Sequence, residues 1–145
     1  MFEIGAFAII FDNRGRVLLC HRTDFDAWNL PGGGVESGEL PTEGVIREVT
    51  EETGLVVEVE QLIAVYGKPA KDELVFSFVC RPVGGKLAIT AESRECRFFQ
   101  PEDLPINTIP NHVERIHDAL KQCPMTLFRR QTAPSLKEKL SQATE

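Results

Sequence analysis

The sequence predicts a single α/β domain. Apolar, β-branched runs that are typical of strands alternate along the chain with two segments of helical periodicity. The chain has 145 residues, of which 42% are hydrophobic. This length is enough for one domain with a substantial core and too short for two comfortable ones. We therefore expect one domain over residues 1–124 and a C-terminal tail over residues 125–145.

The N-terminal part of the chain is typical of a β-hairpin. Residues 4–11 (IGAFAIIF) form an apolar run that ends in turn-forming residues, and residues 17–21 (VLLCH) form the expected partner. Residues 22–26 form a polar loop, in which Arg22 could lie beside a substrate. Residues 28–30 then form a short strand, which leads into three consecutive glycines that allow the backbone to approach a ligand closely: Gly32, Gly33 and Gly34.

A helix is predicted over residues 41–53. Pro41 in the first turn and Gly54 after the last turn are the expected start and stop signals. One face of this helix carries three carboxylates at positions i, i+3 and i+4: Glu48, Glu51 and Glu52. The opposite side carries residues suited to packing: Thr42, Ile46, Val49 and Thr53.

Three carboxylates on one face repel one another, and Arg47 alone cannot neutralise all three. A hard divalent cation can, because Mg²⁺ and Mn²⁺ prefer carboxylate oxygens and combine them with substrate phosphates. The alternative is a solvated run of glutamates, since charge runs usually face water. A calcium-binding protein is a further alternative, but the chain has no DxDxDG-like loop. We expect Mg²⁺, with Mn²⁺ as the second choice.

The second half of the chain continues the alternation of strands and helices. Strands are expected over residues 55–65 and 74–82, a turn at residues 84–85, and a last strand that begins at Arg97. A second helix is expected over residues 111–122. In the tail, residues 135–141 could form a short helix, so the tail is either mobile or an oligomer contact, and a homodimer is one alternative.

Composition excludes several classes of function. The net charge of −6 argues against binding to a nucleic-acid polymer, which normally requires a basic face. No apolar stretch is long enough to cross a bilayer, and the N-terminus does not resemble a secretion signal, so the expected location is the cytoplasm. The scattered cysteines contain no CxxC pair, which argues against zinc and disulfide roles. Cys20 and Cys80 lie in strand-like runs and are expected to be small buried hydrophobic residues.

The segment GGVESGELPTEGVIREVTEETGL, from Gly33 to Leu55, resembles the Nudix box at every specified position. The resemblance extends to residues 28–32 and through the glutamates near Glu92, so it spans most of residues 4–120. It implies an α/β/α sandwich with a mixed central sheet, with one predicted helix on each face. It also implies a divalent-metal-dependent hydrolase of nucleoside diphosphates linked to another moiety.

Roles follow for individual residues of this box. The expected metal ligands are three side chains and one backbone carbonyl: Glu48, Glu51, Glu52 and Gly32. Arg47 is expected to hold the carboxylates in place, and Glu39 to anchor the loop. The expected substrate contacts are Arg22, Gly33 and Gly34.

The residue that orients and deprotonates the attacking water is one of the helix glutamates or Glu92. Glu92 lies six residues before Phe98, where the family more often has tryptophan, and so fits the family's loop glutamate. Glu95 is close by, and a solvated loop acid is the alternative for Glu92.

The expected substrate is a small nucleotide, because the box selects the scissile group and the side loops select what is attached to it. A (d)NTP pyrophosphohydrolase is the first hypothesis, and an ADP-ribose or sugar-nucleotide pyrophosphatase is the alternative. Pro69 lies one residue from where ADP-ribose-hydrolysing relatives carry a proline. A nucleotide-binding module that has lost catalysis is a remote alternative, because all three helix glutamates are present.

Overall fold

The computed structural model describes residues 1–133, so the helix expected over residues 135–141 lies outside the described part. The strands are β1 (Glu3–Ile9), β2 (Val17–Arg22), β3 (Trp28–Asn29), β4 (Gly32–Gly34), β5 (Leu55–Lys68), β6 (Glu73–Gly85), β7 (Ser93–Phe99) and β8 (Leu127–Arg130). The α-helices are α1 (Pro41–Thr53) and α2 (Pro110–Leu120), and two short 3-10 helices are η1 (Pro69–Lys71) and η2 (Pro101–Asp103).

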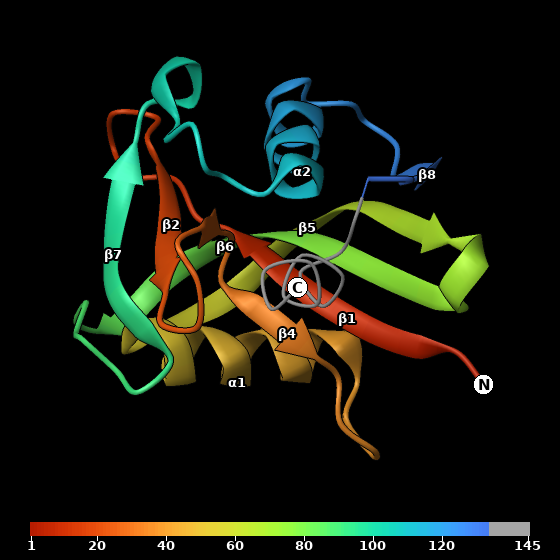
Figure 1. Cartoon of the computed structure of the whole chain (residues 1–145), viewed down its shortest axis with the longest axis horizontal. Coiled ribbons are helices and arrows are strands. Elements are labelled where there is room, and N and C mark those ends of the chain that lie inside the picture. The colour runs from red at the N-terminus through yellow and green to blue at the C-terminus, as the bar shows by residue number, and fades with distance from the viewer. Residues whose placement is uncertain (134–145) are drawn as a thin grey trace.

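The strands form two sheets with α1 and α2 on opposite faces of the longer one (Figure 1). The five-stranded sheet has the order β4-β1-β6-β5-β8. It is mixed, because β1 runs parallel to β6 and β5 parallel to β8, whereas β4 and β1, and β6 and β5, are antiparallel. The second sheet is antiparallel with the order β3-β2-β7. The expected sandwich with a mixed central sheet is therefore confirmed.

Strand β1 has apolar contacts on both of its faces, which explains its unbroken apolar sequence. Successive side chains point to opposite faces. Ala8 packs in the core under α1, which includes Val45 and Val49 of that helix. Ile9 packs in the core under α2, which includes Ile116.

Helix α1 has the predicted bounds because its local sequence specifies both ends. The Glu43 carboxylate accepts a hydrogen bond of 2.8 Å from the Leu40 N–H, which would otherwise lack a partner. Gly54 ends the helix with φ of 82°, a left-handed conformation that favours glycine. Val49 and Thr53 are buried on the packing side.

The expected hairpin between residues 4–11 and 17–21 is wrong. Strand β1 pairs with β4 and β6, and β2 pairs with β3 and β7 in the other sheet. The contact between the two segments is reduced to a bridge between Phe11 and Val17 and a hydrogen bond from the Leu18 N–H to the Ile10 carbonyl. A turn between two apolar runs can equally form the corner where a chain changes sheets, and local sequence does not distinguish the two.

The later strands extend beyond the predicted ranges. Strand β5 continues to Lys68, β6 includes the glycines at 84 and 85 that were expected to turn, and β7 begins at Ser93 rather than Arg97. Strand β8 was missed, and it places residues 127–130 of the expected tail beside β5 in the central sheet. Its short sequence has little alternation, and its partner lies about sixty residues earlier in the chain.

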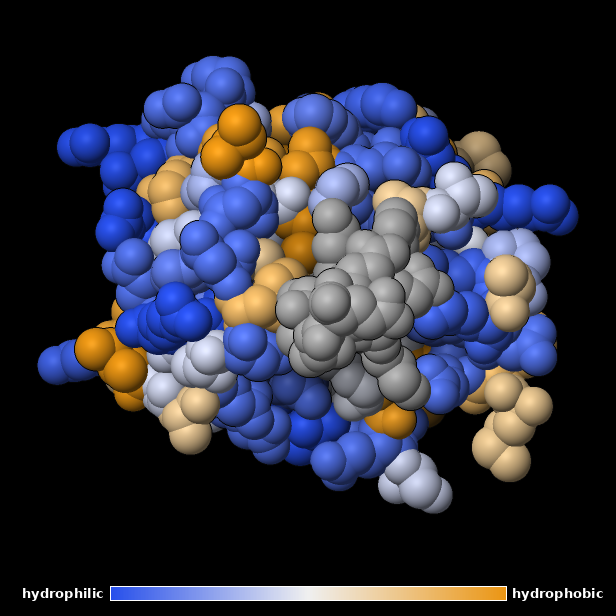
Figure 2. Space-filling view, viewed as in Figure 1, coloured by the Kyte–Doolittle hydropathy of each residue, from blue (hydrophilic) through white to orange (hydrophobic). Residues whose placement is uncertain are grey.

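The face shown in Figure 2 is mostly hydrophilic, with apolar residues in separate groups. Within residues 1–133, no helix is long and apolar enough to cross a membrane. The homodimer considered from the sequence stays a prediction.

Candidate active site

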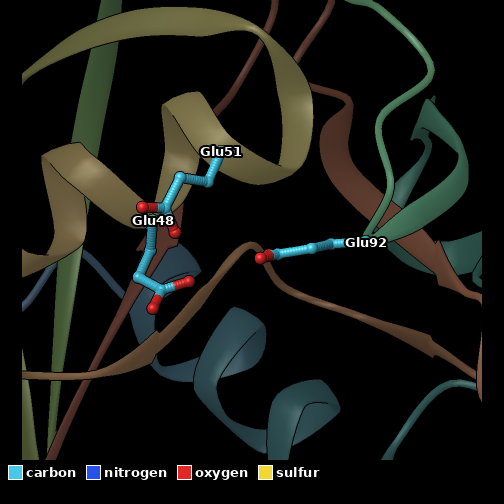
Figure 3. Close-up of side chains that lie close together, drawn as sticks. All are labelled: Glu48, Glu51 and Glu92. Carbon is cyan, nitrogen blue, oxygen red and sulfur yellow. The ribbon is translucent and has the colours of Figure 1, made fainter.

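Three carboxylates from two parts of the chain converge beside α1 (Figure 3). Glu48 and Glu51 extend from neighbouring turns of α1, and Glu92 comes from the loop before β7. One oxygen from each lies within 4.8 Å of the other two. Glu95, the neighbouring acid, instead contacts Arg97 at 2.9 Å. These carboxylate oxygens suit a hard divalent cation.

Glu52 lies beside this cluster but is turned inward. Its Oε2 accepts a hydrogen bond of 2.8 Å from the Gly32 N–H, and its side chain is buried. Burial raises the pKa of Glu52 to about 9, and the negative charges of Glu48 and Glu92 act in the same direction. Burial also raises the pKa of Glu48. A cation near these carboxylates would oppose both shifts, because it favours the ionised forms.

The glycines of β4 let this strand approach both β1 and α1. Gly32 has φ of 150°, and a Cβ there would lie 2.6 Å from the Cα of Phe7 on β1. A Cβ on Gly33 would lie 2.8 Å from the carboxylate carbon of Glu48. The space beside the Glu48 carboxylate therefore exists because residue 33 has no side chain. The carboxylate oxygens of Glu48, Glu51 and Glu92 are ligands that fit a bound divalent cation.

Arg47 connects the glutamates of this region. Its guanidinium donates two hydrogen bonds to Glu39, of 2.8 and 2.9 Å, and its Nη1 donates to Glu48 at 3.1 Å and to Glu51 at 3.2 Å. Its Nη2 also donates to the Gly34 carbonyl at 3.1 Å. These contacts hold the pKa of Glu39 down to about 2, chiefly through the hydrogen bonds from Arg47. The Arg47 guanidinium thus joins α1 to the loop that precedes it.

Arg22 is the last residue of β2 and is held by the loop that follows this strand. It contacts Asp24 at 2.7 and 2.5 Å, while its positive charge favours the ionised form of Glu52. The neighbouring His21 stacks on Trp28 with ring centroids 4.5 Å apart, and is not part of the carboxylate cluster.

His112 on α2 supports the glycine segment from the opposite side, which the sequence did not reveal. Its Nδ1 accepts a hydrogen bond of 2.9 Å from the Leu30 N–H, two residues before Gly32. Burial holds the pKa of His112 well below its usual value, so the ring is neutral and can accept this hydrogen bond. The two residues are 82 positions apart, and the helix expected over residues 111–122 did not indicate this contact.

A cavity of about 670 Å³ lies at the edge formed by β1 and β4, and the described residues that line it do not include Glu48, Glu51, Glu52 or Glu92. Its lining includes Gly33 and Gly34 of β4, Phe7 of β1, and Glu39, which pairs with Arg47. This volume lies in the range of small-molecule sites.

Comparisons with known proteins agree with this geometry. The family described as "NUDIX domain" matches residues 1–122. A protein of Bacillus subtilis (strain 168), provisionally named an 8-oxo-dGTP diphosphatase, is 34% identical over 119 residues, covering 81% of this chain and 80% of that protein. The ADP-ribose pyrophosphatase of Methanocaldococcus jannaschii is 35% identical over 103 residues, covering 66% of this chain and 61% of that protein.

Solved structures give the same result for the fold. A Nudix hydrolase from Nitrosomonas europaea matches with a TM-score of 0.75 and 23% sequence identity, covering 89% of this chain and 79% of that one. Nudix enzymes generally use divalent metals and act on small nucleotides, which agrees with the acidic cluster beside α1. The chain belongs to the Nudix family of hydrolases.

Proposed function

We propose that this chain is a pyrophosphohydrolase of the (d)NTP type that depends on Mg²⁺ or Mn²⁺. The observation that carries the proposal is the convergence of Glu48, Glu51 and Glu92, whose oxygens lie within 4.8 Å of one another. Hard divalent cations prefer such oxygen ligands and usually share them with substrate phosphates.

The residues of α1 and β4 have two separate roles, which are cation binding and positioning of the carboxylates. Glu48, Glu51 and Glu52, with the Gly32 carbonyl, would hold the cation, which would supply positive charge against the phosphoryl oxygens of the substrate. Arg47 acts as a positioning residue, because its contacts of 3.1 and 3.2 Å fix the Glu48 and Glu51 carboxylates.

The reaction is the addition of water to a phosphorus atom of the anhydride. The new P–O bond forms as the bridging P–O bond breaks, and the leaving phosphate departs with the bonding electron pair. The proton of the water passes to a carboxylate: Glu51, Glu52 or Glu92. A nucleoside triphosphate would yield a nucleoside monophosphate and pyrophosphate.

Charge around the cavity supports an orientation for the substrate. Its lining includes four carboxylates, Glu3, Glu36, Glu39 and Glu73, and Arg47 pairs with Glu39 among them. Carboxylates repel phosphates, so the phosphates lie at the cation and the nucleoside extends along Gly33 and Gly34 towards Phe7. Arg22, on the β2 side of the site, contacts the substrate once it exchanges its Asp24 partner.

The likeness to the Bacillus subtilis protein favours the (d)NTP type, because it covers 81% of this chain and the likeness to the ADP-ribose pyrophosphatase covers 66%. An ADP-ribose or sugar-nucleotide pyrophosphatase is the second candidate, supported by that archaeal relative.

A hydrolysis screen with Mg²⁺ tests the proposal. The panel contains (d)NTPs, oxidised dNTPs, ADP-ribose, sugar nucleotides and dinucleoside polyphosphates, each with and without EDTA. We expect the highest kcat/KM for a (d)NTP, loss of activity in EDTA, and release of pyrophosphate. A preference for ADP-ribose would support the second candidate, and nucleotide binding without turnover would indicate a silent binding module.

A further inference from the structure

Cys20 and Cys96 lie opposite each other on β2 and β7. They are partners in the register of these antiparallel strands, and their sulfur atoms are 3.1 Å apart. Opposed residues in such a pair have Cα atoms about 4.5–5.5 Å apart, which falls within the range of about 4.4–6.8 Å found in disulfides. The sequence argued against a disulfide because the cysteines are scattered and contain no CxxC pair, whereas the sheet register brings these two together across 76 positions.

Cys96 also contacts the backbone of the active-site helix. Its Sγ lies 3.5 Å from the Glu52 carbonyl oxygen, which also accepts a hydrogen bond of 3.2 Å from the Thr90 hydroxyl. The Thr90 hydroxyl oxygen in turn accepts the Glu92 N–H at 3.2 Å. Three successive contacts therefore connect the Cys96 sulfur to the Glu92 N–H.

We propose that Cys20 and Cys96 form a reversible disulfide that lowers turnover at the carboxylate cluster. The oxidant is a peroxide. The two thiols lose two protons and two electrons as the S–S bond forms, and hydrogen peroxide gains them as its O–O bond breaks and two waters form. A thiol reductant reverses the change by exchange.

The effect on the site follows from what the new bond removes. The sulfur atoms must move from 3.1 Å to the disulfide length of about 2.05 Å. The Cys96 S–H is lost, so Thr90 alone donates a side-chain hydrogen bond to the Glu52 carbonyl. The bond also fixes β7 against β2 four residues after Glu92, so Glu92 is displaced relative to Glu48 on α1.

Exposure is compatible with oxidation at one of the two sulfurs. Cys96 is half-buried, so a small peroxide can approach it, while Cys20, whose sulfur lies 3.1 Å away, is buried. Among the cysteines within residues 1–133, Cys20 and Cys96 are the two whose sulfur atoms are in direct contact.

The test is limited oxidation of the full chain with hydrogen peroxide in EDTA, followed by removal of the peroxide. We expect the free thiols to fall from four to two. A non-reducing peptide map should join the peptides of Cys20 and Cys96, and Tm should rise because the crosslink restricts the unfolded chain. Turnover with Mg²⁺ should fall several-fold and return with dithiothreitol.

Variants separate this pair from general oxidation. Cys96→Ser and Cys20→Ala should retain their turnover after peroxide treatment, whereas Cys123→Ser, which removes another half-buried thiol, should respond like the wild type. Persistence of four thiols, a disulfide mapped elsewhere, or undiminished turnover of the oxidised chain would overturn the proposal.

The turnover measurement rests on the proposed function. A reduced chain that hydrolyses nothing in the panel would count against that function, while the thiol count and the peptide map would still decide whether the disulfide forms.

Discussion

The charged side chains of the two helices on opposite faces of the central sheet have contrasting surroundings. On α1, negatively charged carboxylates cluster at a partly open site, and the pKa of Glu52 is raised to about 9. On α2, the charged side chains of Arg115 and Asp118 are buried and contact partners within the protein. The difference indicates which face is built for a ligand, because Arg47 alone does not neutralise the clustered carboxylates and the remaining negative charge favours binding of a cation.

The network on α2 is buried and largely complete. Arg115 donates from Nε and Nη2 to the Gln131 side chain at 3.1 and 2.9 Å, and its guanidinium lies 5.0 Å from the Phe7 ring centroid. Asp118 accepts hydrogen bonds from the Tyr66 hydroxyl at 2.7 Å and from Arg129 at 2.8 Å. These contacts fasten the β8 segment to α2, so this face serves stability.

The largest expected effect is the loss of activity on removing one charge from the α1 site. Glu51→Gln, Glu52→Gln and Glu92→Gln should each lower kcat/KM about 100-fold or more, because each weakens binding of the cation that stabilises the transition state or activation of the water. Their unfolding free energies should stay equal or rise slightly, since repulsion among carboxylates is relieved. The measurements are hydrolysis kinetics at fixed Mg²⁺ and urea unfolding.

Glu114→Gln on α2 is the matched control, since Glu114 lies 3.8 Å from Arg129 and far from the carboxylate cluster in the fold. Equal activity loss in this control would show that charge in general, and not the site, governs turnover.

The converse change on α2 should reduce stability and leave chemistry intact. Asp118→Ala leaves the buried Tyr66 hydroxyl without its acceptor and Arg129 without its closest partner. We expect a loss of about 2 kcal/mol in unfolding free energy. Below the unfolding transition, kcat/KM should be unchanged. A large fall in kcat with unaltered stability would mean that the two faces are coupled.

The α1 site was predictable because its information is local. The bounds of α1, the shared face of Glu48 and Glu51, and the glycines before the helix all follow from residues within about twenty positions of one another. The position of Glu92 in the site was expected only from the family resemblance. Glu92 lies in the loop before β7, about forty positions after the glutamates of α1.

The contacts of the α2 face were not predictable, because they join residues that are far apart in the sequence. The contacts from His112 to Leu30 and from Tyr66 to Asp118 join residues 82 and 52 positions apart, and β8 pairs with a strand equally remote in sequence. The inward turn of Glu52 was missed as well. Helical spacing places a side chain on a face, but its partner, the Gly32 N–H, depends on how β4 packs.

A smaller effect is expected in the pH dependence of stability. Burial, followed by the charge of Arg115, holds the pKa of His112 well below its ordinary 6.5 in the folded chain. The unfolded chain takes up this proton below about pH 6.5 and the folded chain does not. The contribution of His112 to stability is therefore full above that pH and is lost as the pH falls towards the folded pKa.

Urea unfolding at about pH 7.5 and about pH 5.5 should show a loss up to about 1.4 kcal/mol larger in the wild type than in His112→Asn. His117→Asn, at an exposed position of the same helix, should lose as much as the wild type. The comparison of variants matters because Glu52, whose pKa is raised to about 9, holds a proton in the folded chain over the same pH range and so opposes the loss. Equal losses in all three proteins would show that His112 does not contribute to the acid sensitivity.

The smallest effect sharpens the comparison at a single methyl group. In Gly33→Ala, the new Cβ would lie 2.8 Å from the carboxylate carbon of Glu48, which must rotate away because it is the end of a flexible side chain. The backbone should keep its position, so Tm should change little. The apparent affinity for Mg²⁺, measured from the metal dependence of kcat/KM, should weaken about fivefold, or about 1 kcal/mol. Gly34→Ala is the matched control, because a Cβ there meets no atom within 4 Å. The same metal requirement in both variants would mean that the position of the Glu48 carboxylate does not set cation affinity, and that Gly33 serves only the packing of β4 on β1.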